Sequence, residues 1–281
     1  MLNTTELNAT ACQIRRDVVR MIHGAKSGHT GGSLGCADYF TVLYFNVMRH
    51  NPQAFRMDGK GEDLFFLSNG HISPVLYSTL ARCGYFPIEE LGTFRKLHTR
   101  LQGHPSTQHH LPGIRMASGS LGQGLSNAVG AALAKKMDRD AGIVYTLHGD
   151  GELGEGQIWE AAMFAGAKGV DNLISTIDYN GLQIDGSTKA VLDLGDLRAK
   201  FESFNWTVLE MNGHDVVEIE KTLNQAKGLC GQGKPIMILM KTEMGHGVDF
   251  MVNDNKWHGT APNDEQAAAA LAQLPVTLGD Y

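Results

Sequence analysis

Apolar residues recur at helical spacing from the start of the chain. Leu7, Ile14, Val18 and Ile22 fall on one face of a helix. The same periodicity predicts helices over residues 37–48, 74–81, 88–97, 122–137, 157–168, 194–204, 215–226 and 264–273. Asp215 is a residue type that commonly caps a helix N-terminus, which supports the helix that begins there.

Short apolar, β-branched runs predict strands over residues 64–67, 143–147, 173–177, 206–209 and 235–240. Strands that alternate with helices predict a parallel sheet with helices on both faces. The expected fold is therefore a three-layer α/β structure, one domain over residues 1–281. Two stretches lack periodicity: a glycine-rich turn over 27–35, and a segment rich in His, Pro, Ser and Gly over 103–119, which we expect to be an ordered functional loop.

Composition narrows the function classes. The formal net charge is -6, so the composition gives no sign of the positive charge with which proteins bind nucleic acid. Residues 1–11 are polar and unlike a signal peptide, and no apolar run is long enough to cross a bilayer. The four cysteines lie far apart, without the paired spacing of a zinc site. We expect a cytoplasmic protein with reduced thiols that binds neither nucleic acid nor membranes.

The strongest local signal is the turn Gly149-Asp150-Gly151, which follows a predicted strand and precedes a helix. Such a turn presents backbone N–H groups at the carboxyl edge of a sheet, where phosphates bind. With Gly154 and Asp178 it also fits a dinucleotide fingerprint, which would indicate a dehydrogenase. However, the carboxylate of Asp150 would repel a pyrophosphate unless a cation joined them, and Mg²⁺ commonly does this.

A second turn supplies further oxygen ligands. The next strand ends in Asp178-Tyr179-Asn180-Gly181-Leu182. Adjacent parallel strands end about 4.8 Å apart, so Asp150 and Asn180 are expected to meet at one ion. A carboxylate, a side-chain amide and a backbone carbonyl suit Mg²⁺ or Ca²⁺. The alternative, that Asn180-Gly181 is only a tight turn, is weakened by the glycine turn one strand earlier.

Motifs along almost the whole chain, from about residue 10 to 262, are similar to those of transketolases and occur in the same order. They are Ser27–Gly35, Leu67–His71, Gly103–Pro105, Gly119–Gly124, Gly149–Gly151, Asn180 and Trp257–Pro262. The resemblance implies a thiamine diphosphate-binding fold and the cofactor thiamine diphosphate. One departure is Thr30, where transketolases usually carry proline.

The resemblance also assigns cofactor ligands. Asp150, Asn180 and the Leu182 carbonyl would hold the metal. Gly151 would donate its N–H to the diphosphate, which also lies near Gly149. Gly119 and Leu121 would lie against the cofactor.

Four of the twelve histidines form a set: His29, His71, His104 and His258 each lie beside glycine in a loop. Loops on a rigid scaffold often carry catalytic groups, and imidazole titrates near neutral pH. By the resemblance, His29, His71 and His104 would face the C1 and C2 oxygens of a ketose donor. His258 would stabilise oxyanion charge, and both His71 and His258 would contact the cofactor.

Glu155 and Glu160 resemble acids that link cofactor sites across the subunit interface of transketolases, although alone they would be read as a solvated helix face. A complete transketolase is more than twice as long. The resemblance therefore implies an N-terminal subunit that acts on sugar phosphates with a separate C-terminal subunit, which carries the pyrimidine-binding domain. Two copies of each chain are expected.

Three alternatives remain open from the sequence. One is a two-chain relative that acts on an unusual ketose such as apulose phosphate or sulfofructose. Another is a non-catalytic paralogue that binds thiamine diphosphate. The third is the dehydrogenase implied by the dinucleotide fingerprint.

Overall fold

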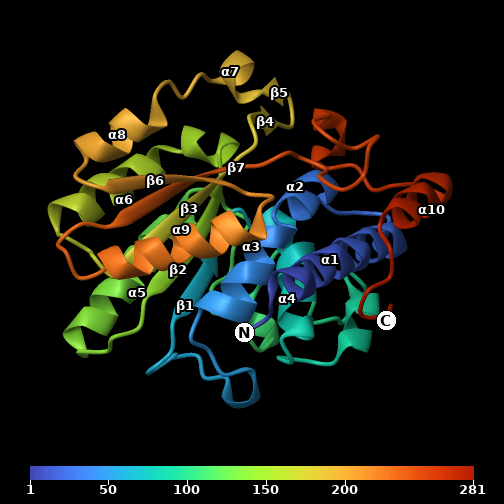
Figure 1. The fold of residues 1–281 in the computed structure, drawn as a ribbon, viewed down its shortest axis with the longest axis horizontal. Coiled ribbons are helices and arrows are strands. Elements are labelled where there is room, and N and C mark those ends of the chain that lie inside the picture. Colours follow the sequence, from blue (N-terminus) through green and yellow to red (C-terminus); the bar gives the residue numbers. More distant parts are fainter.

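A five-stranded parallel sheet forms the centre of the protein (Figure 1). The computed structural model describes all residues, 1–281. The strand order is β1 (Leu64–Leu67), β2 (Val144–Gly149), β3 (Leu173–Tyr179), β7 (Ile236–Lys241) and β6 (Thr207–Asn212). Gly149 pairs with Asp178, and Asp178 pairs with Met240. The carboxyl ends of β2, β3 and β7 therefore lie together at one edge of the sheet.

Helices cover both faces of the sheet, as the alternating pattern predicts (Figure 1). One face carries α1 (Thr4–Ala25), α3 (Ala37–Val42), α4 (Ser73–Arg82) and α9 (Val216–Leu229), with α10 (Asp264–Gln273) packed on α1. The other face carries α5 (Gln123–Met137), α6 (Gly156–Ala167) and α8 (Leu197–Ser203). The three-layer α/β prediction is confirmed.

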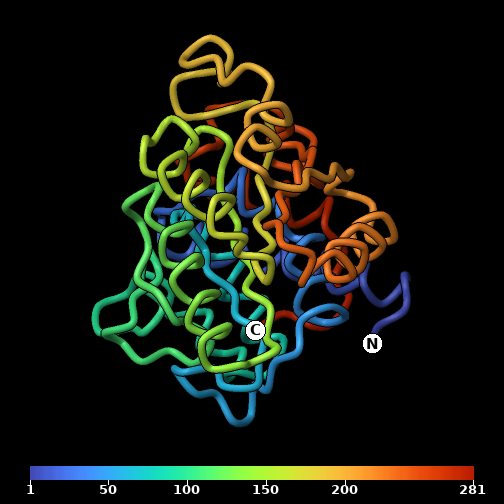
Figure 2. Tube along the Cα trace, turned by 90° about the vertical axis from the view of Figure 1, so that its left-hand side faces the viewer, coloured from blue at the N-terminus to red at the C-terminus, as the bar shows by residue number.

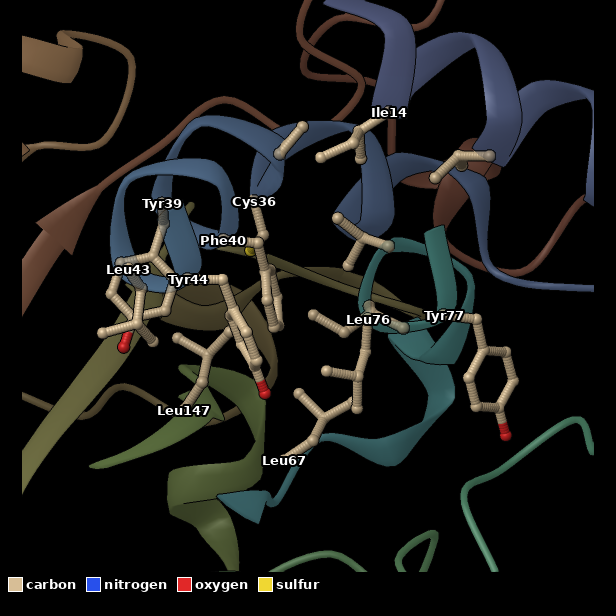
Figure 3. Close-up of a cluster of buried hydrophobic side chains, with 14 of the residues drawn as sticks. Ile14, Cys36, Tyr39, Phe40, Leu43, Tyr44, Leu67, Leu76, Tyr77 and Leu147 are labelled. Carbon is tan, nitrogen blue, oxygen red and sulfur yellow. The ribbon is translucent and has the colours of Figure 1, made fainter. Parts of the chain in front are cut away.

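Alternate residues of each strand feed two separate cores. In β1, Phe65 and Leu67 join the larger core, whereas Leu64 and Phe66 join the smaller one. Figure 3 shows part of the larger core, with Leu67 and Leu147 from the sheet facing side chains of α1, α3 and α4. Because both faces are buried, β1 and the first five residues of β7 read as continuous apolar runs.

Helix starts follow the capping residues. Asn3 and Glu6 form a reciprocal capping box at the start of α1. Asp215 caps α9 by accepting hydrogen bonds from the N–H groups of Val217 and Glu218, at 2.9 and 3.2 Å. The cap predicted at Asp215 is confirmed.

The prediction of a glycine-rich turn over 27–35 is wrong for its second half, which forms the short helix α2 (Thr30–Gly35). Glycines disfavour helix, but here they permit close packing. A Cβ at Gly35 would lie 2.8 Å from the carbonyl oxygen of Glu243, and the Thr30 hydroxyl donates to the Thr260 carbonyl at 3.0 Å. Tertiary contacts therefore override the local propensity.

The helix predicted over 88–97 is also wrong, because only a 3-10 helix over Ile88–Thr93 forms. The chain then adopts left-handed backbone at Arg95 and His98, with φ of +57° and +64°. Such residues interrupt a right-handed helix.

A small hairpin that the sequence did not predict follows β3. It consists of β4 (Leu182–Gln183) and β5 (Gly186–Ser187), and it leads into the short helix α7 (Thr188–Val191). In Figure 2 the gold segment that follows it stands at the top end of the molecule. The strands have two residues each, too few to show a periodic pattern.

None of the helices is both long and apolar enough to cross a membrane.

Candidate active site

One cavity of about 340 Å³ opens at the carboxyl ends of β2 and β3. Its lining includes every metal-binding, cofactor-binding and histidine residue predicted from the sequence: His29, His71, His104, Gly119, Leu121, Gly149, Asp150, Gly151, Asn180, Leu182 and His258. It also includes residues for which no contact with thiamine diphosphate, metal or ketose was predicted: Gly32, Asn69, Ile72, Glu152, Asp178, Gln183, Ile184 and Met244. Ligands bind in such a crevice beyond the carboxyl ends of parallel strands.

The Asp150 turn and the Asn180 turn meet at the floor of this cavity. Asp150 accepts hydrogen bonds from the N–H groups of Gly151, at 2.7 Å, and Gly181, at 2.6 Å. The Asn180 amide donates to Asp178 at 3.0 Å, and its oxygen accepts the N–H of Leu182 at 2.9 Å. These bonds fix the orientation of the carboxylate and of the amide.

The floor has a surplus of buried negative charge. Burial, followed by the negative charge of Asp178, raises the pKa of Asp150 to about 7. Burial also raises the pKa of Asp178. A divalent cation would relieve this repulsion, because it favours the charged form of both acids. Carboxylate, amide and carbonyl oxygens are suitable ligands, so the residues present fit Mg²⁺ or Ca²⁺.

Two glycines of the cavity lining allow neighbouring side chains to approach the backbone closely. A Cβ at Gly151 would lie 3.0 Å from the Gln183 Oε1 atom, and one at Gly119 would lie 3.0 Å from the His104 ring. The Asn69 Oδ1 atom in the cavity lining is buried and has no hydrogen-bond partner, so it can accept a hydrogen bond from a bound molecule. The glycine turn and the acidic floor together fit a diphosphate held between backbone N–H groups and a cation.

Four histidines from four different loops gather above this floor. The ring centroid of His29 lies 4.9 Å from that of His71, 5.5 Å from that of His258 and 6.4 Å from that of His104. The His71 and His258 rings are 5.3 Å apart. The set that the motifs predicted is thus brought together in space.

Burial keeps these imidazoles neutral at pH 7. Burial and the neighbouring histidines lower the pKa of His29 to about 4 and that of His71 to about 3. Burial also lowers the pKa of His104 and of His258. A neutral imidazole offers one donor and one acceptor, which suits both hydroxyl and carbonyl oxygens. The Nδ1 atom of His29 is buried and has no partner within the protein.

Comparison with known proteins decides the family. The family described as "Transketolase, thiamine diphosphate binding domain" matches residues 7–277. The chain belongs to this family. The dehydrogenase alternative is therefore set aside.

The relatives of this transketolase domain fall into two classes. A 6-deoxy-6-sulfo-D-fructose transketolase subunit from Clostridium sp. (strain MSTE9) is 43% identical, and the alignment covers 96% of each chain. A subunit of the apulose-4-phosphate transketolase from Phocaeicola vulgatus is 39% identical over 92% of this chain and 90% of that one. By contrast, transketolase 2 of Escherichia coli is 37% identical over 90% of this chain but only 39% of its own length.

Solved structures show the same relation. The transketolase of Campylobacter jejuni superposes with a TM-score of 0.89 at 35% identity, over 97% of this chain and 43% of that one. This transketolase domain thus spans less than half the length of the solved relative.

Glu155 and Glu160 are exposed and lie outside the cavity. Their predicted role at a subunit interface stays a prediction. The buried acid of this segment is Glu152, which accepts the N–H groups of Gly122 at 2.8 Å and Gly149 at 3.1 Å, and a bond from Ser68. Burial alone would raise the pKa of Glu152, but the nearby His148 imidazole and hydrogen bonds from Ser68 and Gly122 lower it.

Glu152 therefore joins the glycine turn to the start of α5, within this transketolase domain. No local pattern distinguishes it from Glu155 in the sequence. Only the tertiary contacts of its carboxylate do so.

A second cluster consists of Asp38, His214 and His246, whose side chains lie close enough together to resemble a metal site. Its hydrogen bonds indicate that it does not bind a metal. The His214 Nε2 atom accepts the N–H of Glu243 at 2.7 Å, so its proton is on Nδ1, which lies 3.3 Å from Asp38. Arg15 also pairs with Asp38. With no free lone pair on His214 and a guanidinium beside Asp38, this cluster is an ion-pair network.

Proposed function

We propose that this chain is the thiamine diphosphate-binding subunit of a two-chain transketolase. The enzyme would transfer a two-carbon ketol unit from a ketose phosphate to an aldose phosphate. The observation that carries the proposal is the content of one cavity, in which an acidic floor suited to a metal and a diphosphate lies below four neutral histidines.

The cofactor ligands are Asp150, Asn180 and the Leu182 carbonyl for Mg²⁺ or Ca²⁺, with the Gly151 N–H for the diphosphate. Asp150 and Asn180 are already oriented by hydrogen bonds. When bound, thiamine diphosphate supplies the nucleophilic carbon and the electron sink that cleavage of a carbon–carbon bond requires.

The protein's own contribution is orientation and hydrogen bonding. His29, His71 and His104 are neutral and line the cavity, so they can donate to and accept from the C1 and C2 oxygens of a ketose. His258 would donate to oxygen as negative charge develops there, and it would also contact the cofactor.

A second polypeptide would complete the enzyme. It would be a C-terminal subunit that carries the pyrimidine-binding domain, with two copies of each chain in the assembly and Glu155 and Glu160 near the interface. Relatives that align over 90% or more of both lengths are named as subunits, whereas the single-chain transketolase 2 aligns over 39% of its length. We place this assembly in the cytoplasm.

The donor ketose is the main alternative within this function. The two subunit relatives, at 43% and 39% identity, are named for sulfofructose and apulose phosphate. The test is a two-carbon transfer assay of the reconstituted complex, with ribose 5-phosphate as acceptor. Xylulose 5-phosphate, 6-deoxy-6-sulfofructose and apulose 4-phosphate would be compared as donors by kcat/KM.

A preference for the sulfonate or for apulose phosphate would retain the reaction and change the substrate. No transfer from any donor, together with tight binding of thiamine diphosphate, would support a non-catalytic binding protein instead.

A further inference from the structure

Arg95 lies between the two loops that carry His29 and His104. Its Nη1 atom donates to the Ser27 hydroxyl at 2.8 Å, two residues before His29. Its guanidinium also lies against the backbone of Gly103, one residue before His104. A Cβ at Gly103 would come 2.7 Å from the Arg95 Cζ atom, so a larger residue there would displace the guanidinium from this position.

The backbone around Arg95 is held in an unusual conformation. Arg95 has a φ of +57°, a left-handed value that is uncommon for a residue other than glycine. Its N–H donates to the Leu101 carbonyl at 2.9 Å, which closes the loop that leads to His104. Residues in such conformations persist when their surroundings determine them, and they are frequent at functional sites.

The loop that receives Arg95 is also fixed from its other side. The Ser73 hydroxyl donates to the Gly103 carbonyl at 2.8 Å, and the Tyr77 hydroxyl donates to the Gln102 carbonyl at 2.9 Å. Arg95 thus connects an already anchored His104 loop to the His29 loop.

Arg95, which is half-buried, also differs in charge pairing from two arginines whose side chains are buried. Arg82 and Arg115 pair with carboxylates, whereas Arg95 has no acidic partner. Burial lowers the pKa of Arg95, but a guanidinium remains charged at neutral pH. The Arg95 guanidinium therefore contacts the Ser27 hydroxyl and the Gly103 backbone and not a carboxylate.

We propose that Arg95 is a positioning residue, which holds the His29 and His104 loops in one arrangement so that both imidazoles face the ketose. It acts through these histidines, because it does not itself line the cavity. The kinetic part of this inference rests on the proposed transketolase function, but the effect on histidine titration does not.

The positive charge of Arg95 supports the same role. It contributes to the lowered pKa of His104 and, after burial and His258, to that of His29. His29 also faces His71 and His104. Removing the charge removes a repulsion of each imidazolium, so the pKa of both histidines is expected to rise.

The test compares Arg95→Gln, which removes the charge, with Arg95→Lys, which keeps the charge but loses the planar guanidinium and its several N–H donors. The control is Arg100→Gln, in the same loop, whose guanidinium is paired with Glu90 at 2.7 Å. Two readouts are used: the pH dependence of kcat/KM in the reconstituted complex, and NMR titration of the histidine Hε1 protons in the full chain.

For Arg95→Gln we expect the acidic limb of kcat/KM and the titrations of His29 and His104 to move to higher pH, with kcat/KM lower by about tenfold or more. Arg95→Lys should restore the titrations but not the rate. Arg100→Gln should match the wild type in both.

Unchanged titrations and unchanged kcat/KM in Arg95→Gln would overturn the proposal. If no variant and no wild-type complex transfers ketol units, the transketolase function fails, whereas unchanged titrations of His29 and His104 in Arg95→Gln would still overturn the proposed contact of Arg95 with both loops. Should Arg95→Gln not fold by circular dichroism, Ser27→Ala replaces it. In Ser27→Ala, a lower kcat/KM with unchanged titrations of His29 and His104 supports the proposal. Wild-type kinetics in both Ser27→Ala and Arg95→Lys overturn it.

Discussion

Asp150 is the residue on which we expect metal and diphosphate binding both to depend. Its carboxylate is buried beside Asp178, and its position is set by two backbone N–H groups. We predict that Asp150→Ala lowers the metal-dependent affinity for thiamine diphosphate by about 100-fold or more, because the anionic diphosphate loses its cation. The fold should remain intact, since a turn carboxylate contributes little packing.

Calorimetric titration of the complex with and without Mg²⁺ measures this affinity. Asp193→Ala is the matched control, because Asp193 accepts one N–H in an exposed turn, from Gly195 at 2.9 Å. Wild-type affinity in Asp150→Ala would refute the proposal that a cation joins Asp150 to the diphosphate.

The histidines should separate into two kinetic classes. His104→Ala is expected to raise KM for the ketose and to lower kcat, for a loss of about 10²-fold or more in kcat/KM with cofactor affinity retained. His258→Ala should weaken both catalysis and cofactor affinity. Steady-state kinetics and calorimetry on the same preparations distinguish the two. Loss of cofactor binding in His104→Ala with an unchanged KM would reverse the assignment.

Individual site residues could be predicted from the sequence where they belong to a recognisable motif. The four histidines, Asp150 and Asn180 could be identified because glycine or proline marks their loops. Their ionisation could not be predicted, because the low pKa of His29 and His71 depends on burial and on rings from distant loops. Glu152 could not be identified for the same reason: its partners, Gly122 and Ser68, are far away in sequence.

Elements with an apolar pattern in the sequence could be predicted, and elements without one could not. Strand β1 and helix α10 have the predicted bounds, because each has a regular apolar pattern. Helix α2 and the β4–β5 hairpin depend on contacts instead. The cofactor site uses both of these irregular segments, which explains why its geometry was less predictable than the sheet.

One hydrogen bond connects the hairpin to the segment that carries His258. The Asn255 amide donates to the Ile184 carbonyl, just after the Leu182–Gln183 strand, at 3.0 Å. We predict that Asn255→Ala loosens the hairpin and weakens binding of thiamine diphosphate by about two- to tenfold, the range for one net hydrogen bond.

Calorimetry of the complex measures this effect as well. Gln232→Ala is the control, since its amide makes a similar bond, to the Gly228 carbonyl at 3.1 Å, on the surface. Equal affinities for thiamine diphosphate in the Asn255 and Gln232 variants would show that cofactor binding does not depend on the hydrogen bond between Asn255 and the hairpin.

At the scale of the whole molecule, the chain carries the acidic floor of the cavity and the four histidines, but it spans only 43% of the length of the Campylobacter jejuni transketolase. Helices α5 and α6 also expose apolar side chains, among them Met163 and Phe164, close to Glu160. Apolar patches of this kind often mark contact with another subunit. Both features agree with a chain that works within a larger assembly.

The central claim is tested most directly by a two-carbon transfer assay on the purified chain, with and without a C-terminal transketolase subunit. Xylulose 5-phosphate and ribose 5-phosphate serve as the first substrate pair, with thiamine diphosphate and Mg²⁺ present. We predict no turnover by the chain alone and turnover when both polypeptides are combined, abolished by Asp150→Ala. Robust turnover by this chain alone, in a preparation free of host transketolase, would contradict the account.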